Sequence, residues 1–392
     1  MKASKVFLTL ISISLLSACS QKESGLLIKI QNTLDIERSS ETVELSKTFL
    51  NLDSLNSSYG VKDSKTNEIL VSQLIDNDGD GTMDALLFQV NMAPNSENTY
   101  EVITVLGEEQ PKSELVCYSR FVPERTDDYA WENDKVAFRV FGPTAQKMIE
   151  DGTPGGTLSS GVDAWLKRVE YPIINSWYKK DLEKTESYHE DNGEGLDNFH
   201  VGSSRGVGGL AYKQDSTYYL SKNYTKWKTI STGPIRTSFY LEYALWGPEG
   251  KQIKESRIVS LDKGSNLSKF EVSINGVNTI SAGLTLHEKD GLVSSHKDET
   301  WVTYWQPHPE SELGTAIVAS SFYYAGNEKY DVETADLSNA YVHLNVKNNK
   351  VVYYSGFAWS KSEQFKDKHD WEQYLSTFAK KINTPLNVEL IQ

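Results

Sequence analysis

The sequence contains very little cysteine: only Cys19 and Cys117 occur among 392 residues. Two cysteines allow at most one intrachain disulfide, and a chain of this length can bury a core large enough to fold without any. Cys117 lies in LVCYSRF, a segment typical of a strand. We therefore expect Cys117 to be a small buried residue, not a catalytic thiol.

Long apolar runs are missing as well. The run VFLTLISISLL (6–16) is too short for a membrane-spanning helix, which takes about 20 residues. It follows the basic MKASK and precedes LSAC, so residues 1–19 resemble a lipoprotein signal peptide in which Cys19 carries the lipid. An ordinary signal peptide cut near Ala18 is the alternative. Both predict export, and the first predicts a membrane-anchored lipoprotein of the outer membrane or periplasm.

Positive charge is scarce: 40 Lys and Arg face 54 Asp and Glu, giving a net charge of −14. This balance argues against nucleic acid as a partner, because phosphate binding requires a basic surface. An anionic ligand would need a local cluster of cationic side chains. The nine Trp and 21 Tyr are consistent with a sugar-binding cleft, but they also suit the packing of a large β-protein.

The chain is dominated by short segments rich in β-branched and aromatic residues, such as KVAFRVFG and KVVYYSGFAWS, separated by turns such as GPEG and DKGSN. This pattern predicts a mainly β fold with packed antiparallel sheets and few helices. A change of character near residue 120 divides the chain into a β-strand region (20–120), which can belong to the same sandwich, and a main catalytic β-sandwich region (121–392).

Helical signal is limited to three segments. Residues 362–382 place Trp371, Leu375 and Phe378 on one face, with Ser362 as a cap. Residues 161–178 predict a second helix that Pro172 ends. The segment PTAQKMIEDG predicts a short third helix.

The segment IDNDGDGTMDALLF resembles a calcium-binding loop, with carboxylates at alternating positions. The candidate ligands of a structural calcium ion are Asp76, Asp78, Asp80 and Asp84. Leu87 occupies the position where a helical calcium loop has its bidentate glutamate, and the flanking segments predict strands. A tight turn stabilised by Asp side chains uses the same residues, so both interpretations stand.

Residues 188–209 (YHEDNGEGLDNFHVGSSRGVGG) concentrate titratable side chains and glycines. His189 and His200 exchange protons near neutral pH, Arg205 can bind a carboxylate through two hydrogen bonds, and Tyr188 can donate a proton. Glycines let the backbone approach a ligand closely. A solvated surface loop is the alternative, but this combination of base, acid and cation favours a catalytic loop.

Two further segments carry candidate substrate-binding residues. They are Arg125, Trp131, Arg139, Lys167, Arg168, Trp177 and Tyr178. Together they would supply cations and aromatic rings for an acidic sugar. A strand with solvated acids and an amphipathic helix are the alternatives for the two segments.

The order of these blocks resembles a family of exported bacterial proteins found alongside enzymes that degrade acidic polysaccharides. The blocks are DDYAWENDKVAFRVFGP, GVDAWLKRVEYPIINSWY, YHEDNGEGLDNFHVGSSRGVGG, RIVSLDKGSNLSKFEVSI and YYSGFAWS, and the resemblance covers most of residues 25–390. One branch of the family comprises ulvan-oligosaccharide dehydratases, which remove water from a terminal uronic acid. The resemblance implies a large antiparallel β-sandwich of the sugar-mutarotase type.

Dehydration of a uronic acid is a β-elimination, so the site needs a cation for the carboxylate, a base and an acid. On chemical grounds we assign Arg205 as the cation, His200 as the base with His189 as its rival, and Tyr188 as the acid. No cofactor is required.

Other functions remain open on sequence grounds. Cleavage of a glycosidic bond by elimination would use the same groups. A glycoside hydrolase would use a carboxylate pair, for which Asp127 with Asp128, or Asp191 with Glu194, are candidates. A non-catalytic surface glycan-binding lipoprotein would need only an aromatic platform.

Overall fold

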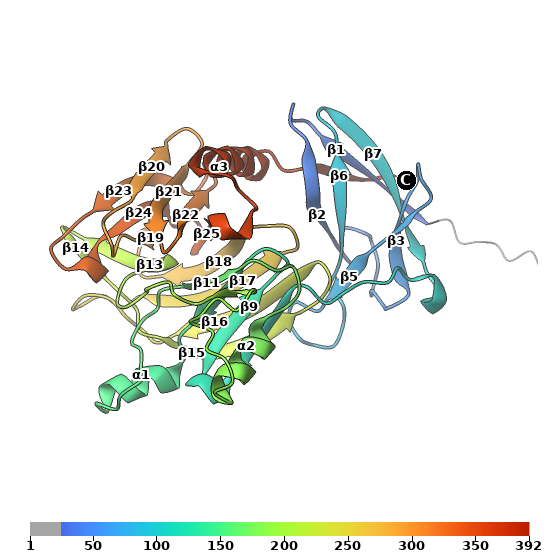
Figure 1. Ribbon diagram of the computed structural model, residues 1–392. Coiled ribbons are helices and arrows are strands. Elements are labelled where there is room, and N and C mark those ends of the chain that lie inside the picture. Colours follow the sequence, from blue (N-terminus) through green and yellow to red (C-terminus); the bar gives the residue numbers. More distant parts are fainter. Residues whose placement is uncertain (1–24, 392) are drawn as a thin grey trace, which may run out of the picture.

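The computed structural model describes residues 25–391 and has a mainly β fold with few helices (Figure 1). The named strands form five sheets in which neighbouring strands run antiparallel. The expected large antiparallel β-sandwich is confirmed.

One layer of the sandwich is an eight-stranded sheet. In spatial order its strands are β15 (Tyr224–Ser231), β16 (Arg236–Tyr243), β17 (Lys254–Asp262), β18 (Leu267–Asn275), β25 (Lys350–Trp359), β22 (Ser311–Ala319), β21 (Trp301–His308) and β20 (Leu292–His296). Tight turns join most sequential neighbours, which is the pattern the turn-forming segments predict.

The opposing layer consists of two five-stranded sheets. The first contains β14 (Thr217–Tyr219), β13 (Val207–Gln214), β19 (Thr279–Thr285), β24 (Asn339–Asn345) and β23 (Tyr324–Tyr330). The second contains β12 (Gly195–Leu196), β11 (Asp163–Lys167), β10 (Ala137–Val140), β9 (Asp128–Glu132) and β8 (Tyr118–Val122). A parallel bridge between Val162 and Gly206 joins these two sheets side by side.

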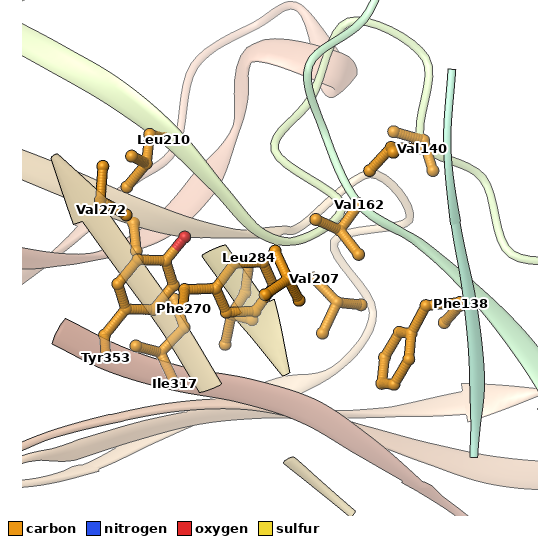
Figure 2. Packing of buried hydrophobic residues seen from close by; sticks show 14 of the residues in the cluster. Phe138, Val140, Val162, Val207, Leu210, Phe270, Val272, Leu284, Ile317 and Tyr353 are labelled. Atoms are coloured by element: carbon orange, nitrogen blue, oxygen red, sulfur yellow. The ribbon is translucent and has the colours of Figure 1, made fainter. Parts of the chain in front are cut away.

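The core of the sandwich lies between the two layers. Figure 2 shows Phe270 and Tyr353 of the eight-stranded sheet packed near Leu284 and Val207 of the opposing layer. Removal of this apolar surface from water is the main force that holds the layers together. Alternate side chains point to the other face of this sheet, and there Trp301, Trp305 and Val318 are buried against helix α3 (Lys368–Asn383).

The N-terminal strands form a separate lobe with its own core (Figure 1). One of its two sheets contains β1 (Leu26–Asn32), β7 (Ser96–Thr104), β3 (Tyr59–Asp63) and β4 (Ile69–Leu70). The other contains β2 (Arg38–Ser46), β6 (Ala85–Met92) and β5 (Ser72–Ile75). The last strand of the chain, β26 (Asn387–Ile391), pairs with β1. The lobe therefore includes both ends of the described chain, whereas the sequence placed only residues 20–120 in an N-terminal region.

Two of the three predicted helices are confirmed, and one is wrong. Helices α3 and α1 (Pro143–Glu150) form where expected, although the side chain that caps α3 belongs to Asp367 and not to Ser362. The helix predicted to end at Pro172 is instead the strand β11, and helix α2 (Ile174–Leu182) begins only after that proline. All five residues of β11 are buried, so this segment lacks the alternation of apolar and polar residues by which a half-buried strand is detected in a sequence.

Within residues 25–391 no helix has the length and apolarity needed to cross a bilayer. The predicted signal peptide and the lipid-bearing Cys19 lie outside the described residues. Cys117 is buried, as expected, and burial raises the pKa of its thiol well above the ordinary value.

Candidate functional site

A cavity of about 400 Å³ opens at one end of the sandwich. Its walls come from the loop segment 198–200, from residues 285–290 after β19, and from residues 306–309 at the end of β21. Three of the seven histidines, His200, His287 and His308, line this one cavity. Imidazoles are the side chains best suited to proton transfer near neutral pH, so we regard this cavity as the candidate site.

Two of these histidines share one carboxylate oxygen. Asp336 Oδ1 lies 2.6 Å from His287 Nδ1 and 3.0 Å from His200 Nε2. The two imidazole rings are 4.0 Å apart between centroids. We call His200, Asp336 and His287 the His–Asp–His cluster. Partial burial acts to raise the pKa of Asp336, but the hydrogen bonds from the Ser203 backbone N–H, His200 and His287 outweigh it and lower the pKa.

The local backbone positions this cluster. The backbone N–H of Ser203 donates to Asp336 Oδ2 at 3.1 Å, which orients the carboxylate. Gly202 has a φ of 50°, and a Cβ at this position would overlap Asp336 Oδ2 and approach His200 Nε2. A glycine is therefore required where the loop passes the cluster. This is the local reason for part of the glycine content that the sequence shows here.

The third histidine, His308, has a different environment. Its Nε2 lies 2.8 Å from Asn198 Oδ1, so its partner is an amide. Partial burial, aided by the charge of Lys361, lowers its pKa to about 4, while Asp290 acts weakly in the opposite direction. His308 is consequently neutral at pH 7.

Two other predicted catalytic residues, Tyr188 and His189, lie at a neighbouring cluster of charged side chains, where Tyr188 is buried and the side chain of His189 is 57 % exposed. The Tyr188 hydroxyl accepts hydrogen bonds from Arg125 Nε at 3.3 Å and from Arg139 Nη1 at 3.4 Å. His189 Nδ1 lies 2.6 Å from the carbonyl oxygen of Asp197. Tyr188 thus contacts two of the predicted substrate-binding arginines, whereas His189 contacts Asp197, and neither lines the cavity that holds His200.

This neighbouring cluster has an excess of buried carboxylates. Arg139 donates to Asp163 Oδ2 at 2.5 Å and to Asp197 Oδ2 at 2.9 Å, and Asp128 Oδ2 lies 3.8 Å from it. Burial raises the pKa of all three aspartates, in the case of Asp128 to about 6. The guanidinium of Arg139 is fully engaged by these partners, which fits a structural role better than substrate binding.

Arg205, the predicted cation for the substrate, is enclosed by protein. Its side chain is 1 % exposed and donates to Ser160 Oγ and to the carbonyl oxygens of Leu210 and Ser203. Burial lowers the pKa of its guanidinium to about 10. The structure therefore does not bring Arg205 into the cavity, because its guanidinium is enclosed by the protein and bound to Ser160, Leu210 and Ser203.

Most predicted substrate-binding residues are also committed to internal contacts. Trp131 is fully buried and donates from Nε1 to Ser268 Oγ. Lys167, also fully buried, pairs with Glu132 at 2.8 Å. The remaining contacts are those of Trp177 Nε1 with Glu194, Tyr178 with Asp128, and Arg168 with Asp191. Three of the four carboxylates named for a hydrolase, Asp128, Asp191 and Glu194, thus have protein partners as well.

The structure of the acidic loop between β5 and β6 is compatible both with a calcium-binding loop and with a tight turn stabilised by Asp side chains. Carboxylate oxygens of Asp76, Asp78 and Asp84 lie within 4.8 Å of one another, while Asp80 is outside this group. The loop also contains the hydrogen bonds of a tight turn, such as Gly81 N to Asp76 Oδ2 at 2.9 Å. Lys47 forms an ion pair with Asp84 at 2.8 Å. Calcium binding here stays a prediction.

A second cavity of about 270 Å³ lies between β2 of the N-terminal lobe and β17 of the sandwich. Arg236, Lys269 and Lys381 line it. Each of them is paired with a carboxylate, Lys381 with Glu41 at 3.4 Å for example. This cavity offers no histidine, so it is not our candidate for proton transfer.

Sequence reasoning missed three residues of the site. His287, His308 and Asp336 are not among the candidate residues that the sequence pointed to. Both histidines follow or end a strand, β19 and β21 respectively, and strand ends are common places for functional side chains. Asp336 carries no signal of its own in the sequence.

Comparison with known proteins identifies a family. A family model described as Domain of unknown function (DUF4861) matches residues 30–388. A protein of Formosa agariphila called "Uncharacterized protein P7" is 52% identical over 381 residues, which is 96% of each chain.

Two solved structures are similar in fold. An alpha-mannosidase from Enterococcus faecalis V583 has a TM-score of 0.52 at 11% identity, over 94% of this chain and 46% of that one. A protein in Glycosyl Hydrolase Family 38 from Enterococcus faecalis has a TM-score of 0.49 at 11% identity, over 95% of this chain and 48% of that one. This chain thus spans about half the length of those proteins. At such low identity the likeness concerns the fold alone.

Proposed function

The chain belongs to the family described as Domain of unknown function (DUF4861), and we propose that it is a carbon–oxygen lyase that dehydrates the terminal uronic acid of acidic, ulvan-type oligosaccharides. The observation that carries the proposal is the cavity shared by the neutral His308 and the His–Asp–His cluster. The substrate class comes from the sequence resemblance. Export as a membrane-anchored lipoprotein is part of the same proposal.

The reaction sets three requirements. Dehydration breaks the C5–H and C4–O bonds of the uronic acid, forms the C4=C5 double bond and releases water. The C5 proton is only weakly acidic while the neighbouring carboxylate keeps its full charge. The site must therefore place a base at C5, return a proton to the departing oxygen and balance the charge that develops on the carboxylate.

We assign proton transfer to His308. An amide oxygen only accepts hydrogen bonds, so the contact with Asn198 Oδ1 makes Nε2 the donor and leaves Nδ1 as the acceptor for the C5 proton. A bound carboxylate would raise the pKa of His308 and so strengthen it as a base. The imidazolium formed would then give the same proton to the departing hydroxyl, and water would leave without a second acid.

The experiment incubates the full chain with uronate-terminated oligosaccharides. We expect the ultraviolet absorbance of an unsaturated uronate, and a mass loss of one water without chain shortening. His308→Gln should lower kcat/KM by about 10²–10⁴, the usual contribution of a general acid–base. His296→Gln is the matched control, because His296 lies at the far end of the strand pair β20–β21. Wild-type kcat/KM in His308→Gln would contradict the role of His308, and absence of unsaturated product would contradict the proposed reaction.

A glycoside hydrolase is the second candidate, because Glu288 and Asp290 line the same cavity. Hydrolases of sugars use two carboxylates on either side of the scissile bond. The same mass spectra distinguish the two reactions, since hydrolysis adds water and shortens the chain.

A further inference from the structure

The cavity described above contains a set of side chains that matches a metal centre. His200 Nε2, His287 Nδ1 and a carboxylate oxygen of Asp336 lie within 4.8 Å of one another. They come from three separate parts of the chain: the loop before β13, the segment after β19 and the short helix η3 (Ala335–Leu337). We propose that these three residues bind a divalent transition-metal ion, with Zn²⁺ as the best match.

The donor set selects the kind of ion. Two imidazoles and one carboxylate suit Zn²⁺ and its first-row neighbours, whereas Ca²⁺ and Mg²⁺ prefer oxygen ligands throughout. Three protein ligands leave a coordination position for water or substrate, which is the arrangement of catalytic zinc sites. The cluster borders the cavity of about 400 Å³, so a ligand in that cavity would have access to the open position.

The surroundings hold the ligands in place. Ser203 N–H orients the carboxylate of Asp336 from the side of Oδ2, which leaves Oδ1 directed at the two imidazoles. The backbone N–H of His287 donates to Thr285 Oγ1 at 3.3 Å, at the end of β19. Residues that orient metal ligands in this way commonly contribute 10–100-fold to metal affinity.

The charge around the cluster favours a cation. Glu288 and Asp290 line the cavity beside it, and Glu288 Oε1 lies 3.8 Å from His287 Nε2. An acidic sugar would be repelled by this wall unless a cation were bound there. A divalent ion would supply that cation.

This step rests on the proposed function: the ion would bind the uronate carboxylate at its open position and balance the charge that develops there during elimination. It would thereby perform the role that the sequence assigned to Arg205. No oxidation or reduction of the ion is involved, because dehydration needs only charge balance and proton transfer.

A hydrogen-bonded cluster without metal is the competing explanation, since two imidazole N–H groups can donate to the same carboxylate oxygen. Metal titration separates the two. The chelator-treated full chain should bind one Zn²⁺ per chain in calorimetry, gain thermal stability with Zn²⁺, and show visible absorption bands of tetrahedral coordination with Co²⁺. Absence of stoichiometric binding in the wild-type protein would overturn the site.

Two variants localise the ion. His287→Gln and Asp336→Asn should weaken Zn²⁺ binding at least tenfold, whereas His296→Gln, which changes a histidine outside the cavity, should bind as the wild type does. Asp336→Asn keeps a hydrogen-bond acceptor in place, so it tests the charge of the ligand with little change in shape. Unchanged affinity in both variants would overturn the assignment of these ligands.

The metal and the lyase reaction can fail separately. Stoichiometric Zn²⁺ binding without any unsaturated product would support the metal site and contradict the proposed function. Equal rates of dehydration with and without chelator would support the proposed function and overturn the role of the metal in it.

Discussion

Arg205 carries five N–H donors in a region that water does not reach, and it satisfies most of them with Ser160, Ser203 and Leu210. Arg205→Ala would leave these buried acceptors without a partner and open a cavity beside β13. We expect the free energy of unfolding to fall by about 2–4 kcal/mol. Urea unfolding measures this loss.

The kinetics of the same variant are equally informative. If Arg205 is structural, the folded Arg205→Ala protein should keep a near wild-type kcat/KM for uronate substrates. Loss of turnover at unchanged stability would instead restore the role that its position in the glycine-rich segment suggested.

His308 makes stability depend on pH. Its pKa in the folded protein is about 4, against an ordinary value of 6.5, because burial disfavours the charged imidazolium. Between these two values the unfolded chain binds more protons than the folded one, so the free energy of unfolding falls as pH falls from about 6.5 to 4.

The corresponding measurement is a series of urea midpoints over this pH range. His308→Gln should lose less stability than the wild type on acidification, because the glutamine does not titrate. Lys361, Asp290 and Asn198 surround His308 and remain in the variant, so their contributions cancel in the comparison. Identical pH slopes for wild type and variant would show that His308 is not held neutral by the fold.

At the scale of elements, the sequence predicts a helix or strand correctly where only one face of that element is buried. Helix α3 buries Trp371 and Leu375 and exposes its opposite face, so its period is visible in the sequence. Strand β11 is buried on both faces, and even its charged residues Asp163 and Lys167 are buried in ion pairs with Arg139 and Glu132. A continuous buried segment carries no period of two, and its nature depends on neighbours distant in the chain.

The same limit applies to the candidate site. His200 was found because local composition in residues 188–209 drew attention to it. Its partners His287 and Asp336 are separated by 49 residues from each other, and Asp336 lies 136 residues from His200. Only the register of β13, β19 and β24 brings them together. Local composition therefore indicated the loop that carries His200, whereas the other walls of the cavity depend on strand pairing that the sequence does not reveal.

At the scale of the whole molecule, the two lobes are linked by the end of the chain. Helix α3 packs on the sandwich, and the strand that follows it, β26, pairs with β1 of the N-terminal lobe (Figure 1). Leu386, Val388 and Leu390 also pack against the core of that lobe. The chain that runs from α3 into β26, together with the pairing of β26 with β1, predicts that the two lobes unfold together.

Deletion of residues 386–392 should break that coupling. The backbone of β1 would lose its partner on one side, and the lobe would lose the apolar side chains of Leu386, Val388 and Leu390, at a cost of several kcal/mol. All nine tryptophans lie at or after position 131, so their fluorescence follows the sandwich alone, whereas far-ultraviolet circular dichroism follows both lobes. The two signals should coincide during urea unfolding of the full chain and separate in the truncated one, with the circular dichroism changing first. Coincident transitions in the truncated protein would show that the lobes are coupled through their other contacts, such as those between β2 and β17 around the second cavity.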